Sequence, residues 1–168
     1  SSTILICTAK TLDWLYIQMI PELRKRYNFN FVFLSSTKRV QEFKSYCNND
    51  DRVIDLEMAL ENINKKNDKI QIIDLARKIE KKYDVNYMSD IIQLVPELSA
   101  YFMDYTDNQI YGNKKSIHQT YNKINSLFHF YQKVFTKHKI QAVIARPKAL
   151  EETIITYIAE KRNIPCTF

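Results

Sequence analysis

Short apolar runs alternate with helical stripes in the first part of the chain. Continuous apolar stretches predict buried strands at residues 4–7 and 29–34, and a more exposed strand at 51–56. Apolar residues three or four positions apart predict a helix over 12–23. Pro21 should kink or divide this helix, because proline removes one hydrogen bond and crowds the preceding turn. The alternation of strands and helices predicts right-handed crossovers in a layered α/β structure.

The middle of the chain has the pattern of helices, and the sheet pattern then returns. Amphipathic stripes predict helices at 68–83, 88–105 and 117–135. The pattern closes with a strand at 141–145, a helix at 150–158 and the start of a strand at 164–168. We therefore expect a single α/β domain over residues 1–168. Its fold should be a Rossmann-like three-layer sandwich with a mainly parallel sheet and a helical insertion at about 68–138.

Composition excludes several common kinds of site. The chain holds a single glycine, whereas a phosphate-cradling loop needs glycine where the backbone approaches the ligand closely. The three histidines and three cysteines lack the spacing of metal ligands or of a disulfide framework. Cys7 and Cys166 lie in apolar runs and should be core thiols in a reduced, cytoplasmic protein. We expect no metal site and no cofactor in this chain.

The net charge of +6 reflects 25 basic and 19 acidic residues. Such an excess fits a nucleic acid, an anionic membrane face or a phosphorylated substrate. Several basic clusters instead fall where helices should end, and cations there complement the helix dipole. These clusters are Arg24-Lys25-Arg26, Lys81-Lys82 and Lys161-Arg162. Solvated helix ends are the favoured interpretation, and a patch that faces phosphate or membrane is the alternative.

Polar residues follow the predicted strands at the edge where open α/β sheets bind ligands. Such sheets bind ligands beyond the carboxyl ends of the strands, near a reversal of strand order. Asp13 could act there as a general base toward an acceptor hydroxyl, or simply stabilise a helix start. Arg146 could hold a phosphate or carboxylate, or pair within the structure. The candidate substrate-binding residues are Thr8, Lys10, Thr11, Ser35, Ser36 and Arg146.

Aromatic residues offer a further candidate surface. A platform for sugar rings or a lipid carrier could be built from Trp14, Tyr16, Tyr87, Tyr101, Phe102 and Tyr105. Aromatic stripes at helical spacing more often belong to the core, so core packing is the favoured interpretation.

Two stretches resemble bacterial capsular and surface-polysaccharide biosynthesis proteins. One is residues 76–85 with Ile91-Ile92 downstream, and the other is 140–145 followed by a helix and Asn163-Ile164-Pro165. The second is similar to the end of the N-terminal domain of GT-B glycosyltransferases, where a glycine usually precedes isoleucine-proline and this chain has Asn163. The resemblance implies an acceptor-binding N-terminal domain of a glycosyltransferase acting in surface-polysaccharide biosynthesis, with no essential metal. It places the nucleotide-sugar donor on a C-terminal domain that is absent here, so this chain alone should be inactive.

The resemblance also implies partners and a location. The partner would be a glycan or a lipid-linked sugar acceptor, with peripheral contact to the inner membrane face as a further option, and nucleic acid is not expected. The alternative function is a non-catalytic basic module that binds nucleic acid or phosphate, with tyrosines stacking on bases. Salt would weaken such binding steeply, because phosphate contacts release counterions. The sequence predicts neither the oligomeric state nor an inverting or retaining mechanism.

Overall fold

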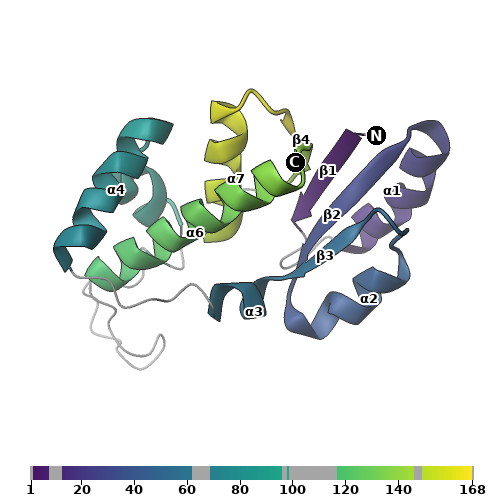
Figure 1. Ribbon diagram of the computed structural model, residues 1–168, viewed down its shortest axis with the longest axis horizontal. Helices are drawn as coiled ribbons and strands as arrows, with labels where there is room; N and C mark the ends of the chain where they lie inside the picture. The colour runs from purple at the N-terminus through teal and green to yellow at the C-terminus, as the bar shows by residue number, and fades with distance from the viewer. Residues whose placement is uncertain are drawn as a thin grey trace.

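A five-stranded parallel sheet forms the centre of the molecule. The computed structural model describes residues 2–7, 13–61, 69–95, 98, 117–145 and 149–167, and the side chains of 13–17 lie outside that description. The strands are β1 (Ser2–Cys7), β2 (Phe29–Ser35), β3 (Arg52–Asp55), β4 (Ile140–Ile144) and β5 (Cys166–Thr167). Their order is β3-β2-β1-β4-β5, so the first strand is central (Figure 1). The expected Rossmann-like α/β class is confirmed.

Helices connect the strands in the expected alternation. They are α1 (Asp13–Arg26), η1 (Thr37–Arg39), α2 (Val40–Ser45), α3 (Leu56–Glu61), α4 (Lys69–Tyr83), η2 (Tyr87–Ile92), α6 (Ile117–Lys137) and α7 (Leu150–Lys161). The helices α4, η2 and α6 occupy the stretch between β3 and β4, where the sequence predicts a helical insertion. None of the described helices combines the length and the apolar character needed to cross a lipid bilayer.

One face of the sheet is covered by α1 and α2 over an aromatic core. Ile20 of α1 and Phe43 of α2 are 3% and 1% exposed. They pack against the strand residues Ile4, Ile6, Phe31 and Phe33. The ring centroid of Phe33 lies 5.9 Å from that of Phe31 and 5.4 Å from that of Phe43. Because side chains alternate across a strand, the intervening residues face the opposite side.

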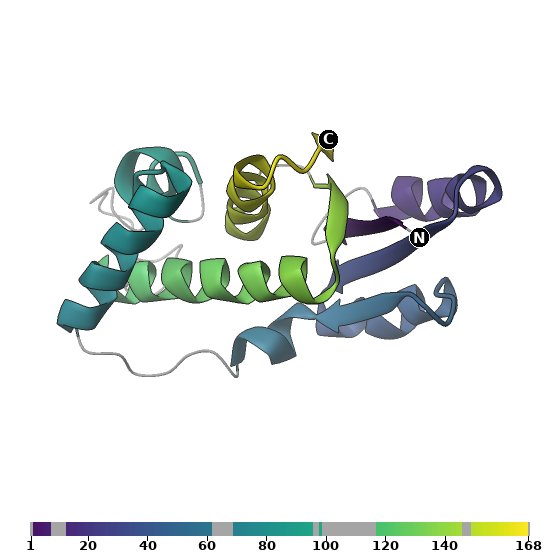
Figure 2. The ribbon, with the colours of Figure 1, turned by 45° about the horizontal axis from the view of Figure 1, so that its top comes forward.

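The opposite face is covered by α6 and α7, which completes the three layers. Leu5 and Val143 of the strands are fully buried there with Phe128 of α6 and Ile154 of α7. The long helix α6 extends from beside α4 to the sheet, where it leads into β4, as Figure 2 shows. Ala76 and Ile79 of α4 belong to the same apolar cluster, so the insertion extends the core of the domain.

Pro21 does not divide α1, so one of the two effects expected of this proline is absent. The helix runs from Asp13 to Arg26 with Pro21 inside it. Ile20 is buried on the sheet and Leu23 packs partly buried on the same face, whereas Pro21 is exposed. Packing of an apolar helix face supplies most of the stability of a protein helix, and here it outweighs the hydrogen bond that proline removes.

Three helices are followed by a non-glycine residue in the left-handed region. Asp84 after α4, Lys139 after α6 and Asn163 after α7 have φ angles of 53°, 50° and 54°. Glycine usually fills such positions, because it has no Cβ to clash. The N–H of Ile164 donates to the carbonyl oxygen of Ala159 at 2.9 Å and so closes the end of α7. Asn163 therefore occupies a left-handed position that glycine usually fills after a helix.

Candidate functional site at the switch point of the sheet

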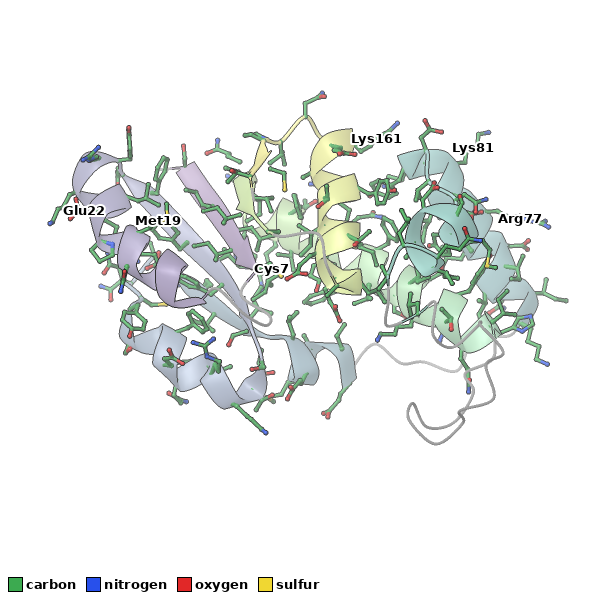
Figure 3. All side chains as sticks on the ribbon, turned by 180° about the vertical axis from the view of Figure 1, so that it is seen from behind. Cys7, Met19, Glu22, Arg77, Lys81 and Lys161 are labelled. Carbon is green, nitrogen blue, oxygen red and sulfur yellow. The ribbon has the colours of Figure 1, made fainter. Side chains whose placement is uncertain are left out.

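The strand order reverses between β1 and β4. The chain leaves β1 for α1 on one face of the sheet and leaves β4 for α7 on the other. In Figure 1 the start of α7 lies near the arrowhead of β1. Open α/β sheets bind ligands in the crevice outside the carboxyl ends of the strands at such a point. The candidate site is therefore the edge beyond Cys7 and Ile144 (Figure 3 labels Cys7).

Most of the predicted site residues flank this point in the sequence but fall outside the described residues. Thr8, Lys10 and Thr11 follow β1, and Arg146 follows β4. Asp13 is the first residue of α1, and its side chain is outside the description. Their roles in binding or proton transfer stay predictions.

Ser35 and Ser36 lie at the end of β2, beside the switch point. Ser35 is fully buried, and its hydroxyl donates to the carbonyl oxygen of Ser36 at 3.0 Å. Ser36 is half-buried and precedes η1 without a side-chain capping bond. Next to them, Thr37 donates a hydrogen bond of 2.8 Å to Oδ1 of Asp55 at the end of β3. Of the two serines, Ser36 is therefore the more accessible to a ligand.

A buried carboxylate lies at the start of α7. Glu152 is 7% exposed, and its Oε2 accepts a hydrogen bond of 2.9 Å from the N–H of Ala149. Its Oε1 lies 3.9 Å from Sγ of Cys7, which donates to it. A buried charged residue needs such partners, because its desolvation is costly. The sequence analysis did not single out Glu152, although a glutamate at the third position of a helix is a known capping signal.

Tyr87, one of the six residues of the predicted aromatic platform, does not lie on the surface. Tyr87 is fully buried in the main core, where its ring stacks on Phe128 with a centroid distance of 6.0 Å. Burial also raises the pKa of Tyr87, with a further contribution from the charge of Glu80. Core packing is thus the right interpretation for Tyr87. The other five aromatic side chains of the platform lie outside the description.

The basic clusters fall at helix ends, as the sequence predicts. Arg24, Lys25 and Arg26 form the last turn of α1, Lys81 and Lys82 that of α4, and Lys161 that of α7. In Figure 3 Lys81 and Lys161 point outward from their helices. Arg24 forms an ion pair with Asp51, and Lys25 pairs with Glu22 at 2.8 Å. Part of the positive charge is therefore neutralised within the domain.

The described residues also contain one hollow away from the switch point, and they offer no group of side chains that could bind a metal. A hollow of about 490 Å³ follows the outer side of α1, lined by Gln18, Met19, Glu22, Leu23, Arg26 and Tyr27. It lies toward the carboxyl-terminal half of α1, far along the helix from the switch point. Within the described ranges, no three histidine, cysteine or acidic side chains gather in a way that could hold a metal ion.

Comparisons with known protein families, with curated proteins and with solved structures found no match to this chain. Its assignment to the Rossmann-like class therefore rests on the strand order and on the helical layers of the sheet. The chemistry of the switch point has to be inferred from the residues that border it.

Proposed function

We propose that this chain is the acceptor-binding domain of a glycosyltransferase that acts in surface-polysaccharide biosynthesis. The observation that carries the proposal is the reversal of strand order between β1 and β4, where α1 and α7 depart toward opposite faces. That arrangement creates the crevice in which α/β enzymes bind small molecules. The similarity of residues 76–85 and 140–145 to capsular biosynthesis proteins supplies the class of reaction.

Charges at the helix starts favour a hydroxyl-bearing ligand over a phosphate at this crevice. Both helices begin with acidic residues, namely Asp13 in α1 and Glu151 and Glu152 in α7. A helix N-terminus attracts anions, but carboxylates already placed there offset its positive end and repel a phosphate. The single glycine also argues against a phosphate-cradling loop. These features support a glycan or lipid-linked sugar acceptor here, with the nucleotide-sugar held by a second domain.

In this proposal Asp13 accepts the proton of the acceptor hydroxyl as the oxygen attacks the donor sugar. Thr8, Thr11 and Ser36 would bind other hydroxyl groups of the acceptor, since each offers both a donor and an acceptor. Lys10 and Arg146 would donate hydrogen bonds to further oxygen atoms of the acceptor.

Two measurements test the proposal. Saturation-transfer NMR should show that the 168-residue chain binds neutral saccharides and does not bind nucleotide-sugars. The protein from the whole natural reading frame should consume a nucleotide-sugar, and Asp13→Asn should lower its kcat by about 10²–10⁴-fold. Glu22→Gln, an exposed acidic position in the same helix, is the control. A whole protein that neither binds nor hydrolyses any nucleotide-sugar would contradict the proposal.

A non-catalytic nucleic-acid or phosphate module has less support. Its motivation is the net charge of +6. Arg24, Lys25 and Arg39, however, pair with Asp51, Glu22 and Glu42 inside the domain. Oligonucleotide binding that weakens steeply with added salt would favour this alternative instead.

A further inference from the structure

The hollow on the outer side of α1 is bordered by exposed apolar side chains. Met19 and Tyr27, which line it, are 44% and 54% exposed, and Leu23 between them is half-buried. The ring of Tyr27 packs against that of Phe29 with a centroid distance of 5.3 Å, which holds it at the end of the row. Contiguous apolar groups on an exposed surface indicate a place where another molecule binds.

The side chains around the hollow form two parallel rows along the helix. The apolar row consists of Met19, Leu23 and Tyr27, and the polar row beside it of Gln18, Glu22 and Arg26 (Figure 3 labels Met19 and Glu22). Within each row the residues are four positions apart. Rows with this spacing are the ridges that pack into the grooves of a neighbouring helix. The surface therefore has the geometry of one half of a contact between two helices.

The polar row carries charges of both signs. Glu22 and Arg26 are exposed and lie four positions apart. Glu22 pairs with Lys25 at 2.8 Å, but both side chains are exposed and solvent weakens such a pair. Among the described residues of α1, Arg24 and Lys25 form ion pairs and Arg26 forms none. The guanidinium of Arg26 is thus available to an acidic group of another molecule.

We propose that this side of α1 is the interface of a symmetric dimer, in which α1 packs antiparallel against α1 of a second copy of the chain. In a twofold contact the same surface meets itself in the reverse direction. With Leu23 near the twofold axis, Met19 of each copy lies across from Tyr27 of the other. The apolar row is then covered, and the Tyr27 ring of each copy enters the hollow of the other.

The order of the charges favours a second copy over an unrelated partner. In the antiparallel arrangement the polar rows meet along the same edge, so Glu22 of each copy lies across from Arg26 of the other. A uniformly acidic partner would be repelled by Glu22, and a basic one by Arg26. The hollow lies in the carboxyl-terminal half of α1, away from the switch point. The inference therefore goes beyond the proposed function and does not depend on it.

The expected dimer is weak, because one helix from each copy makes a small interface. Stable complexes usually bury about 20–30 residues on each side, far more than line this hollow. We therefore expect a Kd of about 10–100 μM. Unfolding and activity measured well below this concentration are properties of the monomer, and Glu22→Gln is a neutral control there.

Sedimentation equilibrium on both sides of this concentration measures the dimer, and charge reversals locate it. Arg26→Glu places acidic residues opposite each other, Glu22→Arg does the same with basic residues, and each should raise the Kd by about tenfold. The double variant carrying both changes restores opposite charges and should return the Kd to within a few-fold of wild type. Lys44→Glu makes the same charge change as Arg26→Glu in the last turn of α2 and should leave the Kd unchanged.

A further variant tests the apolar row. Met19→Glu brings a charge into the covered surface and should raise the Kd by more than about tenfold. Because Met19 is 44% exposed in the single chain, its Tm measured at low protein concentration should stay close to that of wild type.

The outcomes separate this interface from any other. A chain that stays monomeric over the whole concentration range would overturn the inference. A dimer that Met19→Glu and the single charge reversals leave intact would overturn it too, because the contact would then lie elsewhere. Weakening by both single reversals without recovery in the double variant would contradict the antiparallel pairing. In each of these cases the proposed function would stand, since it concerns the crevice at the switch point.

Discussion

The hydroxyl of Tyr87 donates a hydrogen bond of 2.8 Å to Oδ1 of Asn125, and both side chains are buried. Nδ2 of the same amide donates to the carbonyl oxygen of Ile72 at 2.9 Å. One asparagine therefore links η2, α6 and α4 inside an apolar cluster. Polar groups in such surroundings are stabilising only while they are paired.

The first prediction concerns this link. Tyr87→Phe should lower the free energy of unfolding by about 1–3 kcal/mol, because Oδ1 of Asn125 is left buried without its donor. Urea denaturation measures the change. Tyr121→Phe, whose ring packs edge-on against Tyr87 with a centroid distance of 5.2 Å, is the matched control and should change little. Equal stabilities of Tyr87→Phe and wild type would show that the amide does not hold the insertion together.

The second prediction concerns the buried ion pair between α1 and the segment before β3. Asp51 accepts hydrogen bonds of 2.7 Å from the N–H groups of Phe31 and Asn48, and it also pairs with Arg24. The side chains of Arg24 and Asp51 are 17% and 1% exposed. Asp51→Ala leaves the arginine charge without its carboxylate and should cost about 3–5 kcal/mol in unfolding free energy.

A double variant and a surface pair check the origin of that loss. Adding Arg24→Met to Asp51→Ala should recover part of the stability, because the uncompensated charge is then gone. Glu22→Gln breaks the exposed pair with Lys25 and should leave the urea midpoint unchanged. If Asp51→Ala were no more destabilising than Glu22→Gln, the buried pair would have no special role.

The sheet could be predicted from the sequence because its strands carry a strong local signal. The apolar runs at 4–7 and 29–34 became β1 and β2 nearly to the residue. The third strand ended earlier than expected, because Leu56 already begins α3. The order of the strands could not be predicted from the sequence, because it depends on pairings between distant parts of the chain, such as that of Leu5 with Val143.

The candidate site was harder to predict, because its buried members are defined by partners far away in sequence. Cys7 and Glu152 form a hydrogen bond although they are 145 positions apart in the sequence. No pattern in the sequence near either residue predicts this contact. Local pattern shows which side of a helix is buried, whereas the pairing of a buried polar group is a property of the whole fold.

The third prediction concerns pH. Burial lowers the pKa of His138, and the positive charges of Lys137 and Arg52 lower it further. As the pH falls below about 6.5, the unfolded chain takes up this proton before the folded chain does. The contribution of His138 to stability is thus complete above that pH and is lost as the pH falls through the folded pKa. His138→Gln should therefore make the Tm fall less steeply between about pH 7 and pH 5.

Matched histidine variants make the pH prediction specific. His129→Gln substitutes an exposed histidine on α6, shortly before His138 in the sequence. Thermal unfolding of wild type and both variants across the pH range gives the slopes. Equal slopes for wild type and His138→Gln would mean that the acid sensitivity of the fold has another source.

The last prediction uses the left-handed turn after α6. Lys139 has a φ angle of 50°, where the Cβ of an ordinary residue comes too close to the neighbouring carbonyl oxygen. Lys139→Gly removes that clash and should raise the free energy of unfolding by about 1 kcal/mol, even though glycine gives the unfolded chain more freedom. Lys133→Gly, at an exposed position inside α6, should instead lower it by about 1 kcal/mol. Opposite signs for the two lysine-to-glycine changes in urea denaturation would show that the conformation at residue 139, rather than loss of a lysine, sets the effect, whereas a loss at both positions would contradict the strained turn.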